Sequence, residues 1–159
     1  MKPLNFTILL LIIFSFSFSG NSNAQKIFVP SAQKYVVLDY SDDTKSDLSL
    51  YSGSYVYIYP GYDENEQSEG RPYIFTLTIF CNKTGSEFTA SRIKQFVGDD
   101  PLQNAKLSNP SIVGNNFYSD EITGKFVILK YTKSGTDYSV KGFFKKHKND
   151  SGYDFYERQ

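Results

Sequence analysis

The chain offers few side chains that could carry out catalysis. It contains one His, one Cys and no Trp. The histidine, His147, lies in the basic run 145–148, where neighbouring positive charges discourage a bound metal ion. We therefore expect it to be a solvated hairpin residue. The sequence also lacks a serine-hydrolase elbow, a zinc-protease helix motif and a P-loop. These observations predict no catalytic residue, no metal site and no cofactor.

The single cysteine, Cys81, ends the apolar run 79–81. No histidine or pair of cations lies beside it in the sequence to stabilise a thiolate nucleophile. A buried cysteine behaves as a small hydrophobic residue, and we expect Cys81 in the core. One cysteine also excludes an internal disulfide framework and a zinc site built on several thiolates.

Carboxylates gather in the segment 63–69, which holds four of them in seven residues. Calcium takes six to eight oxygen ligands, and this loop could supply several. A charged hairpin tip explains the same composition, so cation binding by this loop stays open. An enzyme would have to rely on carboxylates, tyrosines or a bound metal, and we rank that hypothesis lowest.

Aromatic residues make up 17% of the chain, all of them Phe or Tyr. A tyrosine stripe runs along two expected neighbouring strands and comprises Tyr51, Tyr55, Tyr57, Tyr59 and Tyr73. Tyrosine combines a flat apolar ring with a polar tip, which suits ligand pockets and partner interfaces. Cross-strand aromatic pairing inside a core would produce the same stripe, and both explanations stay open.

The charge balance excludes one class of partner. The chain has 159 residues, with 17 basic and 17 acidic side chains. A formal charge of zero provides no basic field to hold nucleic acid. The length favours a single domain.

The first 24 residues are typical of a secretory signal peptide. Lys2 supplies a positive start, an apolar stretch covers 6–18, and Ser22 and Ala24 are the small residues of a cleavage site. The apolar stretch is 13 residues long, whereas a membrane span needs about 20. We predict cleavage after Ala24, a single all-β domain over 25–159, no stable membrane anchor after cleavage, and a secreted or periplasmic location.

The mature chain alternates apolar and polar residues with a period of two, which predicts β-strands. Turn residues separate the runs. The expected strands are 34–40, 50–59, 73–81, 87–96, 112–118, 124–132, 137–145 and 153–158. The segment 102–108 is a further short strand or an irregular crossing, and 99–111 is the best place for a helical turn. The fold class is therefore all-β, an antiparallel up-and-down barrel or sandwich of about eight strands, with no long helix.

The segment Gly53–Tyr55 at the start of the first long strand, together with Arg158 near the chain end, resembles lipocalin-type barrels. Tyr55 occupies the position of that family's tryptophan. The resemblance implies that the first long strand and the last strand are neighbours. It also implies that Arg158 packs over the Tyr55 ring and closes one end of the core.

Two functions follow as hypotheses. The first is an exported, non-catalytic barrel that binds a small apolar or amphipathic ligand, with Tyr55, Tyr57 and Phe75 facing the interior and Arg158 closing the end. The alternative is a secreted sandwich that binds a protein or a surface polymer through a Tyr-rich face. The two hypotheses differ in the direction of the tyrosine stripe, which points inward in the first and outward in the alternative.

Overall fold

The computed structural model describes residues 24–63, 68–99, 104–147 and 152–159. Apart from Ala24, the predicted signal peptide lies outside the described residues, as does most of the acidic segment 63–69. The described part is nearly all β-structure, with one 3₁₀ turn, η1 (Leu48–Tyr51). Its strands are β1 (Lys26–Val29), β2 (Lys34–Val37), β3 (Tyr40–Asp42), β4 (Gly53–Tyr59), β5 (Tyr62–Asp63), β6 (Ser68–Glu69), β7 (Tyr73–Cys81), β8 (Phe88–Phe96), β9 (Ala105–Lys106), β10 (Ser111–Val113), β11 (Asn116–Tyr118), β12 (Thr123–Lys133), β13 (Thr136–Lys146) and β14 (Tyr153–Arg158).

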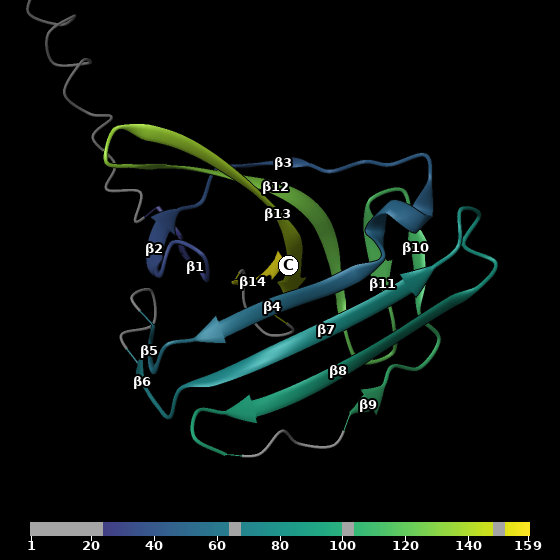
Figure 1. The fold of residues 1–159 in the computed structure, drawn as a ribbon, viewed down its shortest axis with the longest axis horizontal. Coiled ribbons are helices and arrows are strands. Elements are labelled where there is room, and N and C mark those ends of the chain that lie inside the picture. Colours follow the sequence, from purple (N-terminus) through teal and green to yellow (C-terminus); the bar gives the residue numbers. More distant parts are fainter. Residues whose placement is uncertain (1–23, 64–67, 100–103, 148–151) are drawn as a thin grey trace, which may run out of the picture.

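Ten strands form one antiparallel sheet that curls into a half-barrel. Its order is β10-β11-β12-β13-β14-β4-β7-β8-β9, and β3 pairs with β12 beside this path. Figure 1 shows β12 and β13 arching on one side of the molecule and β4, β7 and β8 running side by side on the other. The two ends of the path are β9 and β10, which are short edge strands.

The last strand pairs with the first long strand, as predicted. Glu157 lies opposite Val56, and Arg158 lies opposite Tyr55. As in an up-and-down barrel, the last strand pairs with the first long strand. The sheet does not close, however, between β9 and β10, which are consecutive in sequence. Because β14 meets β4, the two halves of the chain share one concave surface.

The predicted strands 73–81 and 153–158 match β7 and β14, and the strands 124–132 and 137–145 are each one residue longer at both ends. The single strand predicted at 112–118 is wrong. It is a hairpin of β10 and β11, because Gly114 takes a positive φ of 63° and turns the chain.

The predicted strand 34–40 is also divided between β2, which pairs with a missed strand β1, and β3. Within the described part of 99–111 the chain forms β9 and the start of β10 and no helical turn. The helical turn is η1, where the Asp47 side chain accepts a hydrogen bond from the Ser49 N–H and caps the start.

Residues 126–129 of β12, 142–144 of β13 and 155–157 of β14 are buried or half-buried, so these parts of the sheet are covered on both faces. Alternate side chains on one face, Phe126, Phe143 and Tyr156, belong to the core inside the curl. Their neighbours Val127, Phe144 and Phe155 belong to a second core on the outer face, which the β1–β2 hairpin covers. The covered parts include the continuous apolar stretches 126–129 and 143–144, whereas 136–139 at the start of β13 are exposed.

Two members of the tyrosine stripe are core residues. Tyr51 stacks on Phe126 with ring centroids 4.1 Å apart, and its hydroxyl donates to the Asp43 carbonyl at 2.8 Å. The Tyr55 hydroxyl donates to the Tyr51 carbonyl at 2.7 Å. For these two residues cross-strand packing accounts for the stripe. Cys81 is 2% exposed, which confirms its predicted place in the core.

We predict that Gly142→Ala destabilises the fold by about 1–3 kcal/mol or more. A Cβ at this position would lie 2.5 Å from the Tyr156 carbonyl oxygen and would collide with the Phe155 ring. Gly70→Ala is the control, because its Cβ would meet nothing closer than 3.4 Å. Urea denaturation of both variants measures the difference. A Gly142→Ala protein as stable as the parent would contradict the packing of Phe155 against β13.

Candidate functional site

The concave face is hollowed at the end of β4 that carries Tyr57 and Tyr59. This inner cavity has a volume of about 470 Å³, within the ~300–1,000 Å³ typical of small-molecule sites. Tyr57, Tyr59 and Tyr73 line one side. The turn 119–123 between β11 and β12 and the ends of β13 and β14 line the other. The cavity thus lies where the two halves of the curled sheet face each other.

Three tyrosines line this cavity, and two further aromatic rings, Phe75 and Tyr156, pack against Tyr57. Tyr57 of β4 stacks on Tyr156 of β14 with centroids 5.4 Å apart, and it lies 6.5 Å from Phe75 of β7. Tyr59 stacks on Tyr73 at 5.0 Å. The five rings come from three neighbouring strands, two from β4, two from β7 and one from β14, so the β14–β4–β7 pairing brings them together. We call these five residues the aromatic floor.

Two cations lie over the aromatic floor without a carboxylate partner among the described residues. The Arg92 guanidinium is 5.1 Å from the Phe75 centroid, and Lys94 Nζ is 4.4 Å from the Tyr73 centroid. Both point to the concave face because they alternate along β8. Of the two, only Arg92 lines the inner cavity. Its half-buried charge is held in place by an aromatic ring rather than by an ion pair.

The Tyr156 hydroxyl is the one buried side-chain polar atom of the described residues that has no hydrogen-bond partner. Tyr156 is fully buried. Burial raises the pKa of Tyr156, as does the charge of Asp154, while Arg92 opposes this shift. The charges and hydroxyls that act on it, Asp154, Arg92 and Tyr73, all line the inner cavity. The hydroxyl is therefore protonated, and it lies in the core and not among the residues that line the inner cavity.

The acidic side chains around the cavity are already engaged with the protein. Asp154 pairs with Lys145 at 2.9 Å and with His147 at 2.8 Å. The predicted solvated tip is therefore wrong for His147, which is half-buried against a carboxylate. Glu121 accepts from the Ser108 N–H at 3.0 and 3.2 Å, and this bond lowers the pKa of Glu121. Asp120 accepts from Asn109 at 2.9 Å.

The four predicted site residues do not share one site. Tyr57 lines the inner cavity, and Phe75 packs beside it under Arg92. Tyr55 is 2% exposed and lies in the core. Arg158 lies beyond Tyr55, where its guanidinium donates to the Ser52 carbonyl at 2.9 Å.

The predicted stack of Arg158 on Tyr55 is not among the ring contacts of the described residues. The Arg158 guanidinium lies instead against Gly53, which has no side chain to displace it. Sequence reasoning missed Arg92 as a residue that lines the inner cavity. The alternation of Arg92 and Lys94 within an otherwise strand-like run was the signal for a charged position facing inward.

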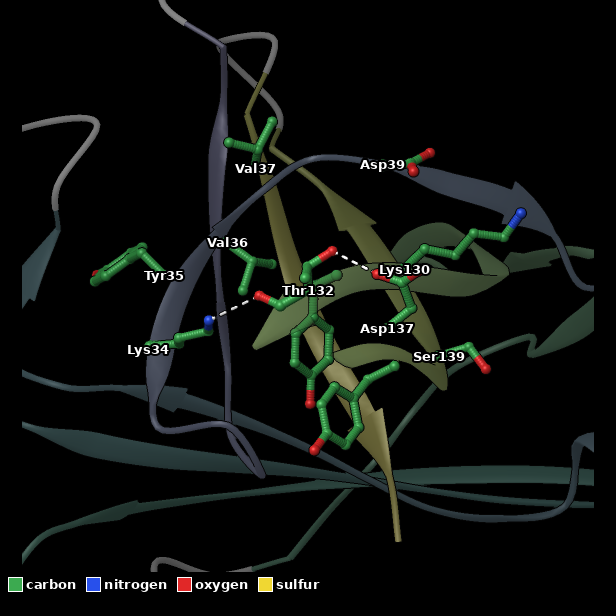
Figure 2. A pocket seen from close by; sticks show the side chains of 11 residues that line it. Lys34, Tyr35, Val36, Val37, Asp39, Lys130, Thr132, Asp137 and Ser139 are labelled. Carbon is green, nitrogen blue, oxygen red and sulfur yellow. Dashed lines mark hydrogen bonds between the residues drawn. The ribbon is translucent and has the colours of Figure 1, made fainter. Parts of the chain in front are cut away.

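A second hollow, the outer groove, lies between β2 and the β12–β13 hairpin and has a volume of about 710 Å³. Tyr131 and Tyr138 stack there with centroids 5.4 Å apart. Figure 2 shows Lys34 Nζ pointing at the Thr132 carbonyl, 3.1 Å away, and the Thr132 hydroxyl donating to Asp137 at 2.7 Å. This groove is larger than the inner cavity, but its Tyr138 is 44% exposed to solvent. We therefore rank it second.

Other kinds of site find no support in the described part of the chain. No group of three or more His, Cys, Asp or Glu side chains there could hold a metal ion. No helix in the described ranges is long and apolar enough to cross a membrane. The acidic segment 63–69 lies largely outside these ranges.

Comparison with protein-family models, with curated proteins and with solved structures gave no match. The geometry of the inner cavity therefore carries the functional argument.

We predict that stability falls steeply above about pH 10. Burial raises the pKa of Tyr51, Tyr55, Tyr57 and Tyr156 above the ordinary value. Above that value the unfolded chain releases protons that the folded protein retains, so stability is present below pH 10 and is lost as pH rises. Each buried tyrosine contributes up to ~1.4 kcal/mol to the loss of folding stability for each pH unit above this value. Denaturation midpoints combined with tyrosinate absorbance measure this. If all 13 tyrosines ionise together in the folded protein, the burial of these four rings is contradicted.

Proposed function

We propose that this is an exported, non-catalytic protein that binds a small amphipathic ligand in the inner cavity. The observation that carries the proposal is a cavity of about 470 Å³ with an aromatic floor on one side and polar groups at its margin. Rings supply the apolar contact area, and a few placed polar groups orient the ligand.

The direction of the tyrosine stripe supports this function over the alternative. Tyr55 is in the core within the curl, and Tyr57 and Phe75 pack against that core on the concave face. An interaction module of the kind considered as the alternative needs a contiguous outward patch. Tyr138, 44% exposed in the outer groove, is the best-placed outward tyrosine for such a module.

The test compares two matched variants. Tyr59 and Tyr138 each stack on a cross-strand tyrosine, one beside the inner cavity and one in the outer groove. Displacement of a fluorescent amphiphile by decanoate or decanol measures binding to the purified mature chain. We predict that Tyr59→Ser weakens binding about tenfold or more, since a buried aromatic contact is lost, and that Tyr138→Ser leaves it unchanged.

Two results would contradict the proposal. Absence of displacement at millimolar amphiphile would show that the cavity does not bind this class. A loss in Tyr138→Ser with no loss in Tyr59→Ser would place binding in the outer groove and favour the alternative.

A further inference from the structure

The first part of β13 forms an open edge of the sheet. β14 pairs with β13 only over residues 142–146. Residues 136–141 pair with β12 on one side and with no strand of the described residues on the other. Figure 1 shows the turn between β12 and β13 projecting away from β14. Residues 136–139 and 141 are exposed to solvent, so this edge is accessible to another strand.

The backbone groups of three residues point out of the open edge. Lys130 lies opposite Ser139 in the β12–β13 ladder, and its N–H donates to the Asp39 carbonyl at 2.8 Å, away from β13. Opposite residues of an antiparallel pair either bond each other or both point away. The N–H and C=O of Ser139 therefore face the open edge. Because this direction alternates along a strand, those of Asp137 and Lys141 face the same way.

We infer that the open edge binds the same edge of a second copy of this chain, in an antiparallel pair centred on Ser139. In this register Ser139 lies opposite its own counterpart, and Asp137 lies opposite Lys141 at both ends. All three positions have outward backbone groups, so each of the three pairs exchanges two hydrogen bonds. The two copies use identical edges related by a two-fold axis, the commonest symmetry of homodimers.

The side chains match in the same register. Asp137 and Lys141 lie on one face of β13 and carry opposite charges, so the two-fold axis produces two cross-strand ion pairs. On the other face Tyr138 comes opposite Val140 of the second copy. Within one chain Val140 packs against the second core and Tyr138 stacks on Tyr131. The pair therefore continues the apolar rows of the outer face from one copy into the next.

Other pairings satisfy this edge less well. Centring the pair on Tyr138 or on Val140 leaves two hydrogen-bonding pairs and places no Asp opposite a Lys. Charged side chains on an edge strand normally oppose pairing with unrelated chains. An extended peptide without matching charges would leave Asp137 and Lys141 unpaired, whereas a second copy pairs both. The charge pattern therefore favours the second copy as the partner.

Sedimentation equilibrium over a series of concentrations tests the inference on the mature chain, for which we predict a reversible dimer. Asp137→Lys and Lys141→Asp each bring like charges opposite each other at two places. Each variant should weaken dimerisation about tenfold or more. The double variant restores opposite charges and should recover the dimer. Lys106→Asp is the matched control, because it makes the same charge change on the distant edge strand β9 and should leave dimerisation unchanged.

Three outcomes would overturn the inference. The first is a monomer at every concentration, and the second is a dimer that both single charge reversals leave intact. The third is a double variant that dimerises no better than the single ones, which would exclude the register centred on Ser139. Residues 137–141 lie outside the lining of the inner cavity, so none of these outcomes decides the proposed function.

Cysteine cross-linking locates the contact directly. Opposite residues of a hydrogen-bonded pair have Cα atoms about 5.5 Å apart, within the reach of a disulfide. Ser139→Cys should therefore form a covalent dimer under mild oxidation about tenfold or more faster than Thr136→Cys, since only the former thiol faces its counterpart at high effective concentration. The native Cys81 is 2% exposed and does not compete. Equal rates for the two variants would contradict the pairing of this edge.

Discussion

The pairing of β14 with β4 is the contact on which the rest of the structure depends. It places Arg158 opposite Tyr55 and Glu157 opposite Val56, and so joins the long β12–β13 arch to the β4–β7–β8 layer. On the concave side this pairing brings Tyr156 against Tyr57. On the outer side the Glu157 carboxylate accepts from the Ser31 N–H at 2.8 Å and holds the β1–β2 hairpin over the second core. One short ladder therefore organises both cores and the cavity floor.

The buried tyrosines differ in how their hydroxyl groups are satisfied. Tyr51 and Tyr55 satisfy their hydroxyls on nearby carbonyls, which stabilises the core. Tyr156 is buried as deeply but has no acceptor, and an unmet hydroxyl of this kind costs about 1–3 kcal/mol.

Strand periodicity predicted the all-β class and the boundaries of β7 and β14, but it left open which face of the sheet is buried. It missed the β1–β2 hairpin and the turn at Gly114, because short strands depend on tertiary pairing and on a single positive φ. Arg92 and Asp154, which both line the inner cavity, are 62 residues apart in the numbering, and no local pattern relates them. The site exists only through the order of strands in the sheet, which alternation along one strand does not encode.

The position of a bound amphiphile tests the central claim most directly. Intermolecular nuclear Overhauser effects between decanoate and the tyrosine rings of the folded protein locate it without any mutation. The account predicts contacts from the ligand tail to Tyr57, Tyr59 and Tyr73, and none to Tyr131 or Tyr138. Contacts confined to Tyr131 and Tyr138 would place the ligand in the outer groove and would contradict the claim.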